Sequence, residues 1–218
     1  MIYQNVRQIL EELPQAVQLV GAAKGHTPEE IIEAIDAGLE IIGENYVQEA
    51  EQAFGFIGKK AKWHMIGHLQ SKKAKKAIRI FDMIETVDSI KLAASIDKAC
   101  QEADRIMEIL IEINSAEEPQ KTGVMPADAF SLVKDISLLE RIRVMGLMTM
   151  GPFVDDPDEL RPYFRKTKEI FDSIKALNLP GVTMRCLSMG MSDSYRVAIE
   201  EGANLVRIGT RLFGERTI

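Results

Sequence analysis

The sequence predicts an α/β protein in which eight parallel strands close into a single (β/α)₈ barrel, the TIM-barrel architecture. Hydrophobic residues make up 46% of the chain and aromatic residues only 6%, so aliphatic side chains and Met fill the interior. Short, uninterrupted apolar runs alternate with segments of helical pattern. Such runs are typical of strands buried on both faces of a parallel sheet. Eight repeats in 218 residues favour closure, and a doubly wound open sheet is the alternative.

The first half of the chain begins with an extra amphipathic helix over 2–12, which ends before Pro14. Thr27, Pro28 and Glu30 then form a helix start, with a capping side chain, a Pro in the first turn and a capping-box acid. Asp88 or Ser89 caps a later, long helix. The predicted strands are 18–24, 40–45, 62–68 and 83–87, and the helices between them are 28–37, 47–54 and 72–80.

The second half repeats the same alternation without a low-complexity linker, which favours one domain over 1–218. The predicted strands are 105–113, 143–148, 184–187 and 205–208, and the helices are 126–138, 158–177 and 192–201. Gly202 fits the left-handed position that ends a helix.

Two neighbouring strand ends carry small residues with hydroxyls and free backbone N–H groups. The stretch 187–193 reads Leu-Ser-Met-Gly-Met-Ser-Asp, and 206–210 reads Val-Arg-Ile-Gly-Thr. Anions bind at such places because unpaired N–H groups and a helix dipole point at one spot. In a barrel, phosphate commonly lies after strands seven and eight. We therefore expect Ser188, Gly209 and Thr210 to form a phosphate cup.

Lys24 closes the first strand and falls in the same mouth as the phosphate cup. Small apolar residues precede it, so its amine is expected to point into a walled site rather than into solvent. A partly desolvated Lys has a lowered pKa and can form a Schiff base with an aldehyde. An aldehyde that also carries a phosphate is pyridoxal 5′-phosphate (PLP).

Charge and composition argue against several other classes of protein. The formal net charge is −6, which does not suit a nucleic-acid binder. Lys72, Lys73, Lys75, Lys76 and Arg79 occur at helical spacing, and we interpret them as a solvated helix face, with a binding surface as the alternative. No apolar run approaches a membrane span and no export signal is visible, so a cytoplasmic protein is expected. Cys100 and Cys186 are interpreted as buried structural thiols.

His64 and His68 do not predict a metal site. Their segment has the pattern of a strand, in which four residues span about 13 Å, too far for one ion. One histidine is expected to line the mouth and the other the core, and no metal is expected.

Five ordered motifs resemble the pyridoxal-phosphate homeostasis protein family, formerly described as alanine-racemase-like proteins. They are Lys24 after its small apolar strand, 42–49, 63–71, 187–193 and 206–214, and together they cover nearly the whole chain. The resemblance implies a barrel that holds PLP on Lys24. It implies no established metabolic reaction, but a role in keeping free PLP and amino-acid pools in balance.

The resemblance also implies roles for three more residues. Arg207 would face the pyridine nitrogen and, because a guanidinium can only donate, would keep that nitrogen unprotonated. Asn45 would hydrogen-bond near the ring hydroxyl or wall, with a turn-forming role as the alternative. Met148 would pack against the ring.

The leading hypothesis is therefore a PLP-binding protein of intracellular PLP homeostasis with little or no turnover, which is expected to be a monomer. PLP itself is the expected partner, together with apo forms of PLP-dependent enzymes. A PLP-dependent amino-acid racemase or decarboxylase is the alternative, but related barrels of that kind carry a further β domain, which is not expected after 214. A third hypothesis is a barrel enzyme in which Lys24 forms a Schiff base with a phosphorylated substrate.

Overall fold

Eight parallel strands form a closed barrel, because β1 pairs with β2 on one side and with β8 on the other. The structure is a computed structural model that describes residues 1–215. The strands are β1 (Gln18–Ala22), β2 (Ile41–Glu44), β3 (Lys62–Met65), β4 (Met83–Val87), β5 (Met107–Glu112), β6 (Ile142–Met148), β7 (Val182–Ser188) and β8 (Leu205–Ile208). The predicted barrel is confirmed, and the open sheet is wrong.

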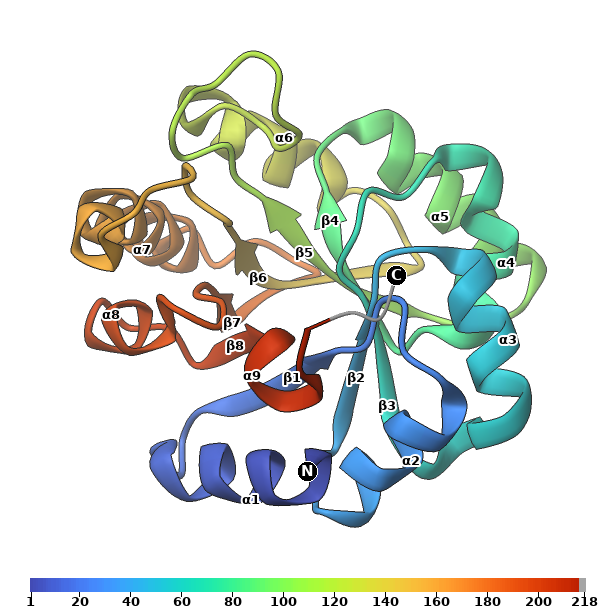
Figure 1. Cartoon of the computed structure of the whole chain (residues 1–218). Helices are drawn as coiled ribbons and strands as arrows, with labels where there is room; N and C mark the ends of the chain where they lie inside the picture. Colours follow the sequence, from blue (N-terminus) through green and yellow to red (C-terminus); the bar gives the residue numbers. More distant parts are fainter. Residues whose placement is uncertain (216–218) are drawn as a thin grey trace.

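The helices form a ring outside the barrel (Figure 1). They are α1 (Ile2–Glu12), α2 (Pro28–Asp36), α3 (Val47–Ile57), α4 (Ala74–Ile80), α5 (Ile90–Glu102), α6 (Ala129–Ile136), α7 (Arg161–Ala176), α8 (Tyr195–Glu200) and α9 (Thr210–Phe213). Single 3₁₀ turns are η1 (Gly58–Lys60), η2 (Ser71–Lys73), η3 (Pro126–Asp128) and η4 (Pro157–Leu160). No helix in residues 1–215 combines the length and the apolar character needed to cross a membrane.

Local sequence signals account for several helix boundaries. The Thr27 hydroxyl accepts the Glu30 backbone N–H and the Glu30 carboxylate accepts that of Thr27, so the predicted capping box opens α2. Ser89, not Asp88, caps α5. The predicted helix 192–201 is shorter, because residues before Tyr195 form a turn in which the Ser194 N–H donates to the Met191 carbonyl.

The buried apolar side chains form two layers, one on each side of the barrel wall. The larger layer lies between strands and helices and includes Trp63, Phe81 and Phe164, all fully buried. The smaller layer fills the barrel, and its members are Val20, Ile41, Ile66, Met83, Leu110, Met148 and Leu205. Alternate residues of each strand point inward, so the side chains one pleat beyond this inner layer lie at the mouth.

Candidate functional site

The mouth at the carboxyl ends of the strands collects the side chains that follow the inner apolar layer. By strand alternation Lys24 continues the inward-facing row of β1, and Arg207 belongs to the inward-facing row of β8. The two strands are neighbours, with Gly21 paired to Ile208. Gly209 packs against β1 so closely that an added Cβ would lie 3.3 Å from the Ala22 carbonyl oxygen. The predicted amine and the predicted anion-binding residues therefore lie on adjacent strands.

A tight turn holds the backbone on either side of Lys24. The His26 N–H donates to the Ala23 carbonyl at 3.0 Å, and Gly25 has a φ of 77°, which favours glycine. The His26 ring stacks on Phe213 of α9, with ring centroids 4.7 Å apart. These contacts tie the Lys24 segment to the chain that follows β8.

The Lys24 ammonium lies 5.0 Å from the centre of the Tyr46 ring. The side chain is half-buried and has no carboxylate partner within residues 1–215. An aromatic face attracts a cation but does not accept its charge as a carboxylate would. The amine is thus placed at the mouth and left without an ion pair.

The strand ends that were predicted to form a phosphate cup present one hydroxyl other than predicted, that of Ser192 instead of Ser188. The Thr210 hydroxyl donates to the Ser192 hydroxyl at 3.0 Å, and the backbone N–H groups of Ser192, Gly209 and Thr210 have no partner in the described part of the chain. The helices here are only six and four residues long. Individual N–H groups and hydroxyls, rather than a helix dipole, therefore make this surface suitable for an anion.

Ser188 lies elsewhere than predicted. Its hydroxyl is fully buried, donates to Glu85 at 2.6 Å and accepts from Arg207 at 2.5 Å. A hydroxyl with both contacts made inside the barrel is not available to a phosphate at the rim. Ser192, four residues later in the same motif, takes its place beside Thr210.

A buried polar network crosses the barrel beneath the mouth. His64 on β3 contacts the Glu85 carboxylate through Nδ1 at 2.7 Å, and Glu85 continues to Ser188 and Arg207. Arg207 also donates to the Thr149 carbonyl at 3.0 Å. The members of this network are at most 5% exposed, so each charge in it depends on the others for compensation.

Electrostatics favour the ionised form of the Glu85 carboxylate. Burial opposes the charge on Glu85, but the His64 and Ser188 hydrogen bonds and the nearby Arg207 charge outweigh burial and hold the pKa of Glu85 below its ordinary value. Burial also lowers the pKa of Arg207, against the opposing effect of Glu85, whose Oε2 lies 3.9 Å from the guanidinium. Glu85, Ser188 and the Thr149 carbonyl therefore hold the Arg207 guanidinium in one position.

The remaining predicted residues lie at the mouth or just under it. Asn45 is half-buried directly after β2, and its side chain makes no hydrogen bond with residues 1–215. Met148 is fully buried in the inner apolar layer. His68 is exposed beyond the end of β3, and His64 is in the core network. No group of three metal-ligating side chains occurs among the described residues.

Three buried carboxylates on strands were not singled out in the sequence analysis: Glu44, Glu85 and Glu112. Each of them interrupts or ends an apolar strand. A charged residue within an apolar run is the sequence signal that indicates such a buried carboxylate. Burial, with help from the Glu49 charge, raises the pKa of Glu44 to about 8. Burial also raises the pKa of Glu112, whose Oε1 accepts the Thr122 hydroxyl at 2.7 Å.

Known proteins that are similar in sequence or structure match this chain over nearly its whole length. The family model for the N-terminal domain of alanine racemase matches residues 1–217. A pyridoxal phosphate homeostasis protein of Aquifex aeolicus (strain VF5) is 37% identical, with 98% of this chain and 97% of the relative covered. PipY of Synechococcus elongatus PCC7942, solved with PLP bound, is 32% identical with a TM-score of 0.90 over 98% of this chain and all of PipY. An alanine racemase of Clostridium difficile 630 shares the fold alone, at 16% identity and a TM-score of 0.85 over 98% of this chain and 59% of the racemase.

Proposed function

The chain belongs to the pyridoxal phosphate homeostasis protein family, and from this premise we propose that it binds PLP covalently through Lys24 as part of intracellular PLP homeostasis. The single observation that carries the proposal is the placement of Lys24. Its amine lies at the end of β1, without a carboxylate partner in residues 1–215, beside the strand that leads to Gly209 and Thr210. An amine that is not held in an ion pair is available to attack an aldehyde.

The residues at the mouth match the chemistry of the cofactor. PLP supplies an electrophilic aldehyde, a phosphate dianion and an aromatic ring nitrogen. Lys24 would attach to the aldehyde carbon with loss of water. Ser192, Gly209 and Thr210 would donate to the phosphate through the hydroxyls and unpartnered N–H groups described above. Asn45 and Met148 would border the ring.

Arg207 would limit catalysis by the bound cofactor. In this proposal it faces the ring nitrogen, and a guanidinium carries donors only. A ring nitrogen that is not protonated withdraws electrons poorly, whereas a carboxylate at that position would favour protonation. Glu85 and Ser188 keep Arg207 in place. We therefore propose binding with little or no turnover.

The absorbance spectrum of the purified protein tests the covalent attachment. The wild type incubated with PLP is expected to keep a visible band after dialysis, and Lys24→Ala is expected to lose it. Lys72→Ala, which removes an exposed lysine of η2, serves as the control and should keep the band. A band that survives in Lys24→Ala, or a colourless wild type, would overturn the proposal.

The alternative of a racemase or decarboxylase has a separate test. Incubation of the PLP-loaded protein with L-amino acids in deuterated water is expected to leave their α-hydrogens unexchanged over many hours. Exchange or inversion at ordinary enzyme rates, on the order of 1–1,000 per second, would favour the racemase alternative.

The proposal extends to a cytoplasmic monomer that folds as one domain over 1–218 and passes PLP to apo-enzymes. Pairing of β1 with β8 supports one folding unit, because the barrel closes only with strands from both ends of the chain. Light scattering would report the mass of the particle. The PLP-loaded protein can be mixed with an apo-aminotransferase, and the rate of its reactivation measured. A rate higher than the rate at which PLP dissociates from Lys24 would support direct transfer.

A further inference from the structure

A groove lined by basic side chains lies at the end of the barrel opposite to Lys24. Its volume is about 760 Å³, and its walls come from the segments that lead into β2, β3, β4 and β5. These segments meet at the amino ends of the strands, whereas the mouth forms at their carboxyl ends. The groove is therefore separate from the proposed cofactor site.

Positive charge exceeds negative charge in this groove. Two acidic residues also line it, Glu40 and Asp82, and the Asp82 carboxylate already accepts the Trp63 backbone N–H at 2.9 Å. The basic residues that line it are Lys59, Lys60, Lys62, Arg79 and Arg105. The chain as a whole carries a net charge of −6, so the charge of this groove is opposite in sign to that of the whole chain.

The groove cations lack the partners that neighbouring lysines have. On the outer face of α4, Lys75 pairs with Glu102 at 2.7 Å and Lys76 pairs with Glu51 at 2.8 Å, so these two lysines fit the predicted solvated helix face. Arg79 is on the same helix but lines the groove. Among residues 1–215, no carboxylate forms an ion pair with any of Lys59, Lys60, Lys62 and Arg79.

Arg105 is fixed in the groove by neutral acceptors. Its guanidinium donates to the backbone carbonyls of Ile78 and, at 3.2 Å, Phe81, which lie at the end of α4. Carbonyl oxygens hold the guanidinium in position but carry no formal negative charge, so its positive charge is not neutralised.

The floor of the groove is rigid and apolar. Trp63 is fully buried, and its indole N–H donates to the Gly58 carbonyl at 3.0 Å. The Phe54 and Trp63 rings form a T-shaped pair with their centroids 5.7 Å apart. Gly58 directly precedes Lys59 and Lys60. The backbone that carries these two lysines is therefore tied to the core.

We propose that this groove binds a small phosphorylated molecule carrying at least two negative charges. Cations held together without counterions repel one another, and a multivalent anion removes that repulsion. Ammonium and guanidinium groups are the usual donors to phosphate oxygens. A diphosphate-type anion would contact the Lys59–Lys62 segment on one wall and Arg79 and Arg105 on the other.

Inorganic pyrophosphate is a suitable probe, and calorimetry at low ionic strength measures its binding. Trp63 is the only tryptophan of the chain, so its emission gives a second readout at the floor of the groove. Pyrophosphate is expected to bind more tightly than orthophosphate, and the double variant Lys60→Glu/Arg79→Glu is expected to bind at least about tenfold more weakly than the wild type. The matched control is Lys72→Glu/Lys91→Glu, which introduces two glutamates at exposed positions outside the groove.

The control double variant is expected to change pyrophosphate affinity less than about threefold. Equal weakening in both double variants, or no pyrophosphate binding to the wild type, would overturn the proposal. If Lys60→Glu/Arg79→Glu unfolds at a lower temperature than the control variant, Lys60→Gln/Arg79→Gln replaces it. Its pyrophosphate affinity is then expected to lie between that of the wild type and that of the glutamate variant. Binding that survives unchanged in both groove variants would also contradict it.

Discussion

At the scale of single residues, Glu85 shows how a charge is accommodated inside the barrel. Its carboxylate is fully buried, yet His64 and Ser188 contact its two oxygens and Arg207 lies 3.9 Å away. A buried charge is tolerated only when hydrogen bonds and an opposite charge replace water. Glu85 therefore has a structural reason to remain ionised and to hold Arg207 at the mouth.

Glu44 is a buried carboxyl group that, unlike Glu85, lacks an opposite charge within residues 1–215 that would compensate its own. It is 2% exposed, and one of its oxygens has no partner in the described residues. Burial raises its pKa to about 8, so the folded protein holds it as a neutral acid at pH 7. The unfolded chain ionises it near pH 4.3, which means that folding must take up a proton between that pH and about pH 8.

We expect Glu44→Gln to stabilise the protein at neutral and higher pH. An acid with a raised folded pKa destabilises the fold progressively as pH rises from the unfolded pKa to the folded one, and the penalty is constant above that. The gain in unfolding free energy should be absent below about pH 4 and reach on the order of 2–4 kcal/mol at pH 8. Urea unfolding of wild type and variant at several pH values measures it. Glu169→Gln, at an exposed position, should show no such trend. A gain from Glu44→Gln that is no larger at pH 8 than at pH 4 would contradict the expectation.

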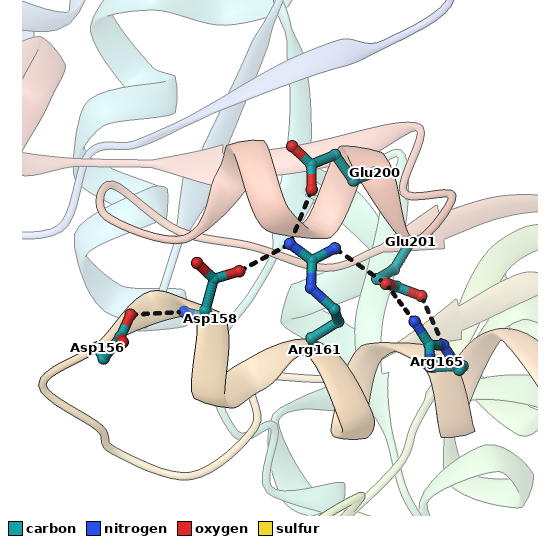
Figure 2. A network of polar contacts seen from close by, with 6 residues as sticks. All are labelled: Asp156, Asp158, Arg161, Arg165, Glu200 and Glu201. Carbon is teal, nitrogen blue, oxygen red and sulfur yellow. Dashed lines mark hydrogen bonds and ion pairs between the residues drawn. The ribbon is translucent and has the colours of Figure 1, made fainter.

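At the scale of elements, one arginine joins the start of α7 to the end of α8 (Figure 2). Arg161 donates to Asp158 at 2.7 Å, Glu200 at 2.8 Å and Glu201 at 3.0 Å. Arg165 adds a two-pronged contact to the same Glu201. Because α8 directly follows the segment that carries Ser192, this network holds the predicted anion-binding side of the mouth against α7.

We expect Arg161→Ala to lower the unfolding free energy by about 1–2 kcal/mol, more than an isolated surface pair contributes. The loss should shrink in high salt, because salt screens these partly exposed charges. Arg7→Ala, which breaks a single exposed pair with Glu11 on α1, is the control and should cost less than about 0.5 kcal/mol. Chemical denaturation at two salt concentrations gives both values. An Arg161→Ala loss equal to that of Arg7→Ala would show that the network adds nothing beyond one pair.

At the scale of the whole molecule, closure of the barrel depends on a close approach between β6 and β7. The register shifts between Val144 and Gly146, and Gly146 has a φ of 155°. A Cβ at Gly146 would lie 1.7 Å from the Cys186 carbonyl oxygen. No side chain fits there without moving a strand.

Gly146→Ala is therefore expected to lower the unfolding free energy by more than about 3 kcal/mol or to prevent folding. Gly55→Ala is the matched control: Gly55 is inside α3 with nothing within 4 Å of an added Cβ. There, alanine should stabilise by about 0.5–1 kcal/mol. Thermal and urea unfolding of the two variants compare them. A Gly146→Ala protein as stable as the wild type would mean that β6 and β7 are not so close in solution.

The predicted strand bounds agree best with the structure where apolar runs are bounded by clear turns. They are wrong where the backbone turns within an apolar run. The strand predicted over 62–68 ends at Met65, and beyond it Gly67 passes so close to the segment after β2 that a Cβ would lie 2.4 Å from the Asn45 carbonyl oxygen. The helices predicted from 126 and 158 begin as 3₁₀ turns at Pro126 and Pro157. Periodicity identifies an element, but contacts between distant segments decide where it ends.

By itself, the sequence determined the alternation of strands and helices and the closed barrel, and it placed Lys24, Gly209 and Thr210 at strand ends, because periodicity, caps and strand ends are local properties. Only the tertiary structure assigned Ser188 to the core network with Glu85, placed Ser192 beside Thr210, and gathered basic residues from separate segments into one groove. These relations join residues far apart in the chain. Their distances are set by the closure and register of the barrel, which no local pattern encodes.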